Sequence, residues 1–106
     1  MKTERLNLIQ TQIEEIKREL ITLGEMRPGS LTQQHRKGCS TGEYYQLSYT
    51  HRMKGKTEYV RKEFAPKVRE QILTFRRFRK LTQLWVKLAI LHAQLKMKLE
   101  KKTLEK

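Results

Sequence analysis

Apolar side chains recur at alternating intervals of three and four residues along the first part of the chain. Glutamate, lysine and arginine fill the positions between them. This heptad pattern predicts an amphipathic helix over residues 3–24, capped by Thr3 and ended by Gly24 and Pro28. Three heptads are few for a stable isolated coiled coil, so the stripe requires a partner surface. The stripe consists of Leu6, Ile9, Ile13, Ile16, Leu20 and Leu23.

Between residues 29 and 64 the apolar period shortens from that of a helix to two. The stretch EYYQLSYT places Tyr45, Leu47 and Tyr49 on one face and polar side chains on the other. This alternation, rich in aromatic and hydroxyl residues, is typical of a half-buried strand. A weaker alternation over residues 30–37 predicts another strand, followed by a loop that has glycine at both ends.

A second clear strand is predicted within the stretch TEYVRKEF. Either Tyr59 or Val60 faces the core, because the register is not fixed by the pattern. The intervening HRMKGK supplies a turn of five or six residues that contains Gly55. Residues 29–64 therefore form a small antiparallel sheet of two or three strands.

The last element is a long helix over residues 66–102. Pro66 suits its first turn, and no glycine or proline follows. An early stripe of Val68, Ile72 and Phe75 is slightly out of phase with a later one, which suggests that the helix leaves the sheet and then meets the N-terminal helix. The later stripe comprises Phe78, Leu81, Trp85, Leu88, His92, Leu95 and Leu99, and Leu84, Ile90 and Leu91 widen it. The fold class is α+β, with the two helices paired.

The composition fits one domain spanning residues 1–106. Hydrophobic residues make up 37% of the chain and charged residues 33%, a lean supply for a core, which favours a homodimer through the helices. No apolar run approaches the roughly 18 residues that a membrane span requires, and the N-terminus lacks the apolar core of a secretory signal. We expect a cytoplasmic protein with no membrane association.

Catalytic and metal-binding signals are scarce in the sequence. The chain has no aspartate, no glycine-rich phosphate loop and a single cysteine, Cys39. Carboxylate-metal sites and phosphoryl-transfer sites generally rely on aspartate, and one cysteine cannot form a cysteine-based zinc site. We therefore expect neither an enzyme nor a bound metal or cofactor.

Positive charge is concentrated in one part of the chain. Residues 1–26 carry four basic and five acidic side chains, so the remaining 80 residues hold a net charge of +14. Between residues 52 and 80, eleven basic side chains face only three acidic ones. Such a concentration of positive charge favours a polyanionic partner, because phosphates that are neutralised by the protein release their counterions. The candidate contacts are Arg52, Lys54, Lys56, Arg61, Lys62, Arg69, Arg76, Arg77, Arg79 and Lys80, with Tyr44 for stacking and Gln46 for a base edge or a phosphate.

The middle of the chain resembles a family of short, uncharacterised bacterial proteins. Their pattern is a Gly-Ser-Leu, a loop, a Tyr-Tyr-x-Leu-Ser-Tyr strand, a Gly-Lys turn and a Val-containing strand leading into a helix. The resemblance covers about half of the chain, and the flanking helices agree with it. Many members carry several cysteines in the loop, similar to a small metal knuckle, where this chain has only Cys39. The matching positions are Gly29, Ser30, Leu31, Gly42, Tyr44, Tyr45, Leu47, Ser48, Tyr49, Gly55, Lys56 and Val60.

The family resemblance implies an accessory protein of a bacterial mobile element, with no established activity. The sheet followed by a helix also looks like the DNA-binding modules at the front of some integrases. Together with the charge, these features predict a nucleic-acid-binding protein, with DNA favoured over RNA as the partner. The alternative is a coiled-coil interaction or assembly module that attracts an acidic protein partner.

Overall fold

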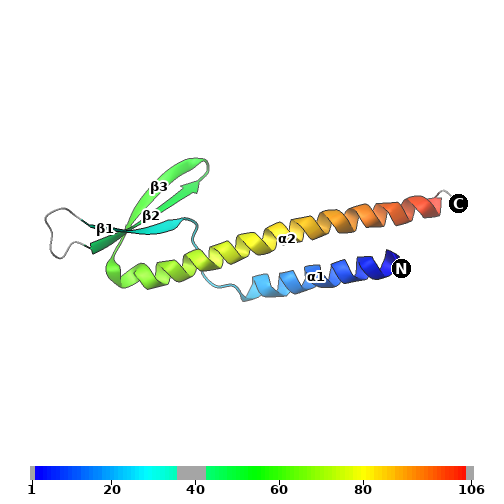
Figure 1. Ribbon diagram of the computed structural model, residues 1–106, viewed down its shortest axis with the longest axis horizontal. Coiled ribbons are helices and arrows are strands. Elements are labelled where there is room, and N and C mark those ends of the chain that lie inside the picture. Colours follow the sequence, from blue (N-terminus) through cyan, green and yellow to red (C-terminus); the bar gives the residue numbers. More distant parts are fainter. Residues whose placement is uncertain (1, 36–42, 105–106) are drawn as a thin grey trace. The chain divides into compact units, whose positions relative to one another are not determined.

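The computed structural model describes residues 2–35 and 43–104, and confirms the α+β class predicted from the sequence (Figure 1). Cys39, Gly42 and the predicted loop around them lie outside the described residues. Two compact units share the chain: Gly24–Arg77 forms a sheet unit, and α1 with the later part of α2 forms a helical unit. The elements in order are α1 (Lys2–Thr22), β1 (Ser30–His35), β2 (Glu43–His51), β3 (Lys54–Val60), a short 3₁₀ helix (Lys62–Phe64) and α2 (Ala65–Leu104).

The sheet unit contains three antiparallel strands in the order β1-β2-β3. The weak alternation after Gly29 is thus confirmed as a strand. One face of the sheet is covered by the first turns of α2, and Leu47 is completely buried between them. This position agrees with the two-residue period of β2, which turns every second side chain toward the helix. The core of the unit comprises Tyr45, Leu47, Val60, Ala65, Val68 and Ile72, with Leu31 and Tyr49 packed at its edge.

The turn between β2 and β3 is shorter than the predicted five or six residues. His51 pairs with Lys54, which leaves only Arg52 and Met53 in the turn. Both have positive φ values, 52° and 65°, as in the two-residue turns that match the twist of a hairpin. The predicted turn was too long because two-residue turns normally carry asparagine or glycine, and Arg52 and Met53 are neither. The sequence pattern therefore placed Gly55 in the turn, whereas it lies within β3.

The short turn settles the register of β3. Tyr45 pairs with Val60, and Gln46 pairs with Tyr59. Val60 is buried, whereas Tyr59 is 68% exposed, so Val60 is the residue that faces the core, one of the two alternatives that the sequence left open. Directly paired residues lie on the same face of a sheet, and Val60 therefore joins Tyr45 on the covered face.

The connection from α1 to β1 runs close to the backbone of β2. Gly29 has a φ of 120°, and a Cβ atom added there would lie 2.5 Å from the carbonyl oxygen of Ser48. Only glycine adopts this conformation without strain. Nearby, the backbone N–H of Arg27 donates a hydrogen bond of 3.1 Å to the carbonyl oxygen of Gln71 in α2. Gly29 and Arg27 thus fix the chain to both β2 and α2.

In the helical unit, α1 runs antiparallel to residues 78–104 of α2 and packs against them (Figure 1). Ile9, Ile13 and Ile16 of the predicted heptad stripe are buried, as is Leu81 of α2. Their burial confirms the predicted pairing of the helices. Thr3 lies within α1 rather than before it, so its predicted capping role is wrong.

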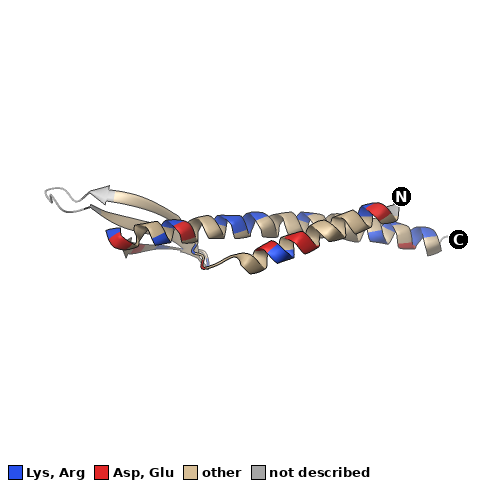
Figure 2. Ribbon diagram, turned by 90° about the horizontal axis from the view of Figure 1, so that it is seen from below, with Lys and Arg blue, Asp and Glu red and all other residues tan. Residues whose placement is uncertain are grey.

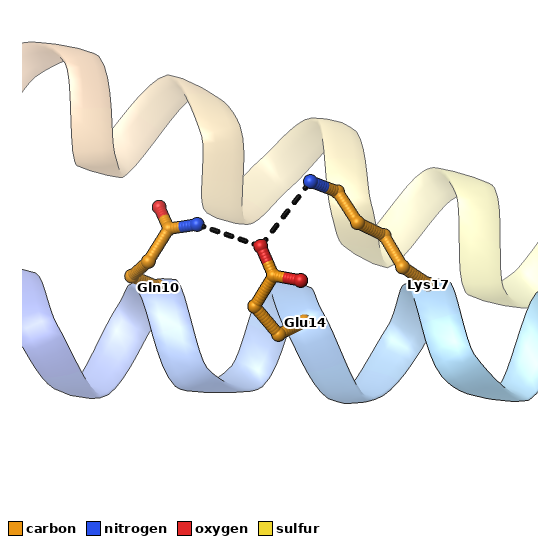
Figure 3. A network of polar contacts seen from close by, with 3 residues as sticks. All are labelled: Gln10, Glu14 and Lys17. Atoms are coloured by element: carbon orange, nitrogen blue, oxygen red, sulfur yellow. Dashed lines mark hydrogen bonds and ion pairs between the residues drawn. The ribbon is translucent and has the colours of Figure 1, made fainter.

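A polar network follows the solvent edge of α1. The Gln10 amide and the Lys17 ammonium group both donate to the same oxygen of Glu14, at 3.0 and 3.3 Å (Figure 3). Lys17 also lies over the ring of Trp85, 5.4 Å from its centroid. The tryptophan is half-buried, and this cation–π contact lies beside the apolar seam.

Candidate nucleic-acid interface

The sheet face opposite α2 carries no lysine, arginine or glutamate among its described side chains. The alternation that buries Leu47 directs the intervening residues of β2 to this uncovered face, together with their partners on the neighbouring strands. Their functional groups are hydroxyls, one amide and two phenols, which donate and accept hydrogen bonds without a charge. The members of this uncovered sheet face are Ser30, Thr32, Tyr44, Gln46, Ser48, Thr50, Thr57 and Tyr59.

Two tyrosines form the aromatic part of the uncovered sheet face. The ring centroids of Tyr44 and Tyr59 lie 5.1 Å apart, with an angle of 27° between the ring planes. Tyr44 is half-buried by this contact, whereas Tyr59 is largely exposed. The expectation that Tyr44 offers a free stacking surface is therefore modified: Tyr44 supports Tyr59, which is the more accessible of the two rings.

Gln46 lies beside the tyrosine pair at the centre of the sheet. It pairs across the strands with Tyr59 on one side and with Thr32 on the other. The Thr32 hydroxyl donates a hydrogen bond of 3.4 Å to the Gln46 carbonyl oxygen, which leaves the Gln46 amide group outside this contact. A glutamine amide can donate and accept at a base edge in a groove.

Basic side chains gather at the turn end of the β2–β3 hairpin. Arg52, Lys54 and Lys56 lie in the turn or within the first three residues of β3, and all three are exposed. The described part of the chain gives none of these three an ion pair. Glu58 is the nearest acidic residue along β3, and its carboxylate is already engaged by Arg27. The hairpin turn thus presents three cations to solvent.

A second group of cations lies where α2 begins. Arg61 pairs with Glu63 at 3.3 Å across an exposed surface, and Lys62 opens the 3₁₀ helix. Because β3 spans about 20 Å at roughly 3.3 Å per residue, these two lie at the opposite end of the strand from the hairpin turn. The candidate residues in the sheet unit are therefore split between two ends of β3 rather than gathered in one zone.

Arg69 and Arg76 occupy one side of α2 in the sheet unit. They are seven residues apart, or two helical turns and about 10 Å. The Arg69 guanidinium lies over the ring of Tyr45, 5.2 Å from its centroid. Leu31 of β1 lies near them, and together with Ile72 and Leu73 these residues line a hollow of about 210 Å³. Two guanidiniums beside an apolar hollow can bind an anionic group.

The remaining basic candidates follow along α2, where lysine and arginine recur (Figure 2). Arg77 ends the sheet unit, and Arg79 and Lys80 belong to the helical unit. All three side chains are exposed. Together with Arg76, these three residues place four cations on two consecutive turns of α2.

A partly buried carboxylate sits on the covered side of the sheet. Arg27 donates a hydrogen bond to Glu58, and the Tyr49 hydroxyl donates to the other carboxylate oxygen at 3.0 Å. The Arg27 hydrogen bond, followed by that of Tyr49, holds the pKa of Glu58 below its usual range. The hydrogen bond to Glu58 raises the pKa of Tyr49 in turn. Arg27 and Tyr49 each bind one oxygen of the Glu58 carboxylate, so this cluster stabilises the fold rather than binding a ligand.

Six residues of the uncovered sheet face were not among the predicted contacts: Ser30, Thr32, Ser48, Thr50, Thr57 and Tyr59. A two-residue turn at Arg52 and Met53 would have revealed Thr57 and Tyr59, because pairing outward from that turn aligns Tyr59 with Gln46. Within residues 2–35 and 43–104, no group of three or more histidine, cysteine or glutamate side chains could hold a metal ion. In the same ranges, no helix is long and apolar enough to cross a membrane.

Comparisons of the chain with protein-family models, with curated proteins and with solved structures gave no match.

Proposed function

We propose that this protein binds nucleic acid, with duplex DNA as the preferred form, through the uncovered sheet face and the cations of the hairpin turn. One observation carries the proposal: an uncharged hydrogen-bonding face with an exposed tyrosine lies on one side of the hairpin, and the three exposed cations at its turn end form no ion pair among the described residues. Lys54 and Lys56, as the partners of His51 and Tyr49, leave the hairpin on its other side. Phosphate contacts supply affinity, and groups such as the Gln46 amide contact base edges.

The hairpin turn and the uncovered sheet face contribute differently to binding because their side chains differ in chemistry. Lysine and arginine attract phosphates over long distances and release counterions when they bind. Hydroxyl and amide groups discriminate only at hydrogen-bonding distance, and a tyrosine ring stacks on any base. The proposed interface therefore binds many sequences through the turn, and the sheet face adds a smaller, sequence-dependent contribution.

Arg69 and Arg76 lie on the α2 side of the sheet, beside the hollow with Leu31, and provide phosphate contacts separate from the uncovered sheet face. The resemblance to bacterial accessory proteins supports a role beside a mobile element, in the cytoplasm. A homodimer through the helices stays a prediction of the sequence.

Charge reversal at the hairpin turn tests the proposal. We expect Lys54→Glu with Lys56→Glu to weaken binding of a fluorescent duplex at least tenfold, measured by anisotropy at low salt, because both phosphate contacts become repulsive. The matched control is Arg5→Glu with Arg18→Glu on α1, which changes the net charge equally at two exposed positions. Equal weakening by both pairs would mean that only bulk charge matters, and would overturn the proposed interface.

The same titration measures the contribution of the sheet face to affinity separately from that of the turn. Tyr59→Ser removes the exposed ring without altering any charge. We expect it to lower affinity several-fold while the salt dependence stays unchanged, since stacking does not release counterions. Circular dichroism confirms that each variant keeps its helices. Wild-type affinity in Tyr59→Ser would remove the sheet face from the interface.

A further inference from the structure

A second apolar stripe runs along the C-terminal half of α2 and is not covered by α1. Its four large side chains are strongly exposed: Val86 by 59%, Ile90 by 53%, Met97 by 69% and Leu104 by 86%. Ala93 is exposed between them. The spacings of four, three, four and seven residues match a heptad seam. We call these five residues the outer stripe.

The outer stripe differs from the seam that packs against α1. That inner seam contains Leu81, which is buried, and Leu88 and Leu95, which are half-buried. Scattered exposed apolar residues are normal on a protein surface, but a row that is unbroken from Val86 to Met97 and resumes at Leu104 is a feature of helices that bind another helix. Leaving the row in water forfeits the free energy of burying four large side chains.

The charged residues around the outer stripe are almost all basic. Residues 83–104 contain five lysines and one glutamate. A hollow of about 680 Å³ follows the last turns of the stripe, lined by Met97 and Leu104 together with Gln94, Lys98, Glu100 and Lys101. An apolar floor among lysines favours an occupant that is apolar in the middle and acidic at its edges.

The same charges argue against a second copy of this chain as the occupant. Let Ile90, Met97 and Leu104 occupy position a of three successive heptads. Lys87 and Lys101 then occupy position e, on one flank of the core, and Lys96 occupies position g, on the other flank. In a parallel pair Lys96 would face Lys101 of the other copy, and in an antiparallel pair centred on Gln94, Lys87 would face Lys101. Neither arrangement pairs opposite charges.

We infer that the outer stripe is a docking surface for an acidic amphipathic helix of another protein. The partner's apolar row covers Val86, Ile90 and Met97, and its glutamates or aspartates face Lys87, Lys96 and Lys101. The surface lies entirely in the helical unit, so the inference does not depend on nucleic-acid binding by the sheet unit. If both hold, the protein connects a nucleic acid to an acidic partner protein.

The test uses the full chain and a synthetic peptide of three heptads, with leucine at the two core positions, glutamate at the flanking positions and a fluorescent label. We expect the peptide to bind, and Ile90→Gln with Met97→Gln to weaken binding at least tenfold in anisotropy titrations. The matched control is Leu8→Gln with Ile21→Gln on α1, whose side chains are 61% and 83% exposed. This control should bind as the wild type does.

Four further measurements complete the test. A peptide of the same composition with its leucines scrambled should bind at least tenfold more weakly, and one with lysine in place of glutamate should not bind. Equal binding of the ordered and scrambled peptides, or no loss in the Ile90→Gln, Met97→Gln variant, would overturn the inference. So would a dimer in sedimentation equilibrium that this variant abolishes, or stripe-dependent binding to vesicles of anionic lipid, because a second copy or a membrane would then be the occupant.

Discussion

Gly29 shows how a single residue secures the start of the sheet. Its positive φ and the close approach of the Ser48 carbonyl oxygen leave no room for a side chain. The position lies directly before β1, so any displacement there moves Ser30 and Leu31, which pair with Ser48 and Leu47. The backbone of Gly29 thus determines whether β1 can join the sheet.

We predict that Gly29→Ala lowers the free energy of unfolding by roughly 2 to 3 kcal/mol, because it adds a strained φ and a clash with backbone. Urea unfolding followed by circular dichroism measures the change. Gly55→Ala is the matched control, since a Cβ atom at Gly55 meets nothing within 4 Å and its φ is ordinary. A loss at Gly29 no larger than at Gly55 would contradict this account of the turn.

At the scale of elements, β3 is joined both to its neighbouring strand and to the connection after α1. The Glu58 carboxylate links β3 to β2 through Tyr49 and to the connection through Arg27. The side chains of Arg27 and Glu58 are 32% and 43% exposed, so solvent screens their attraction and limits its contribution. The cluster accordingly contributes modest stability, with a defined dependence on pH.

We predict that Glu58→Gln destabilises the protein by about 1 kcal/mol at pH 7. The folded-state pKa of Glu58 is lowered, so its contribution is complete above the unfolded-state pKa, about 4.3, and is lost as the pH falls through the lower folded-state pKa. Thermal unfolding of both proteins from pH 7 to pH 2 should therefore show their difference shrinking in acid.

The exposed Arg61–Glu63 ion pair provides the control for Glu58→Gln. Glu63→Gln should change stability by only a few tenths of a kcal/mol at pH 7. A Glu58→Gln difference that stays constant from pH 7 to pH 2 would show that lost packing, rather than the charge of Glu58, causes the destabilisation.

The elements themselves could be predicted because their periods differ. Ile9, Ile13 and Ile16 follow a helical period, and Tyr45 and Leu47 follow a strand period, so both were placed correctly. The part of the uncovered sheet face that β3 contributes could not be derived, because it depends on the register of that strand. Arg52 and Met53 adopt a conformation that neither residue favours, and a shift of one residue in that turn would exchange Tyr59 with Val60.

At the scale of the whole molecule, charge and exposed apolar surface are distributed unevenly. The cations of the hairpin turn belong to the sheet unit, and the outer stripe belongs to the helical unit. This separation allows each surface to be altered alone. The Lys54→Glu, Lys56→Glu variant should retain peptide binding, and the Ile90→Gln, Met97→Gln variant should retain duplex binding.

The most direct test of nucleic-acid binding is the affinity of the unmodified protein for a labelled random duplex across salt concentrations, with single-stranded DNA and RNA measured alongside. We predict that the logarithm of the affinity falls linearly with the logarithm of salt concentration, with a slope of about −3 to −5 for roughly four or five phosphate contacts. Duplex DNA should bind more tightly than the other two. No binding at low salt, or an affinity that does not change with salt, would contradict the central claim.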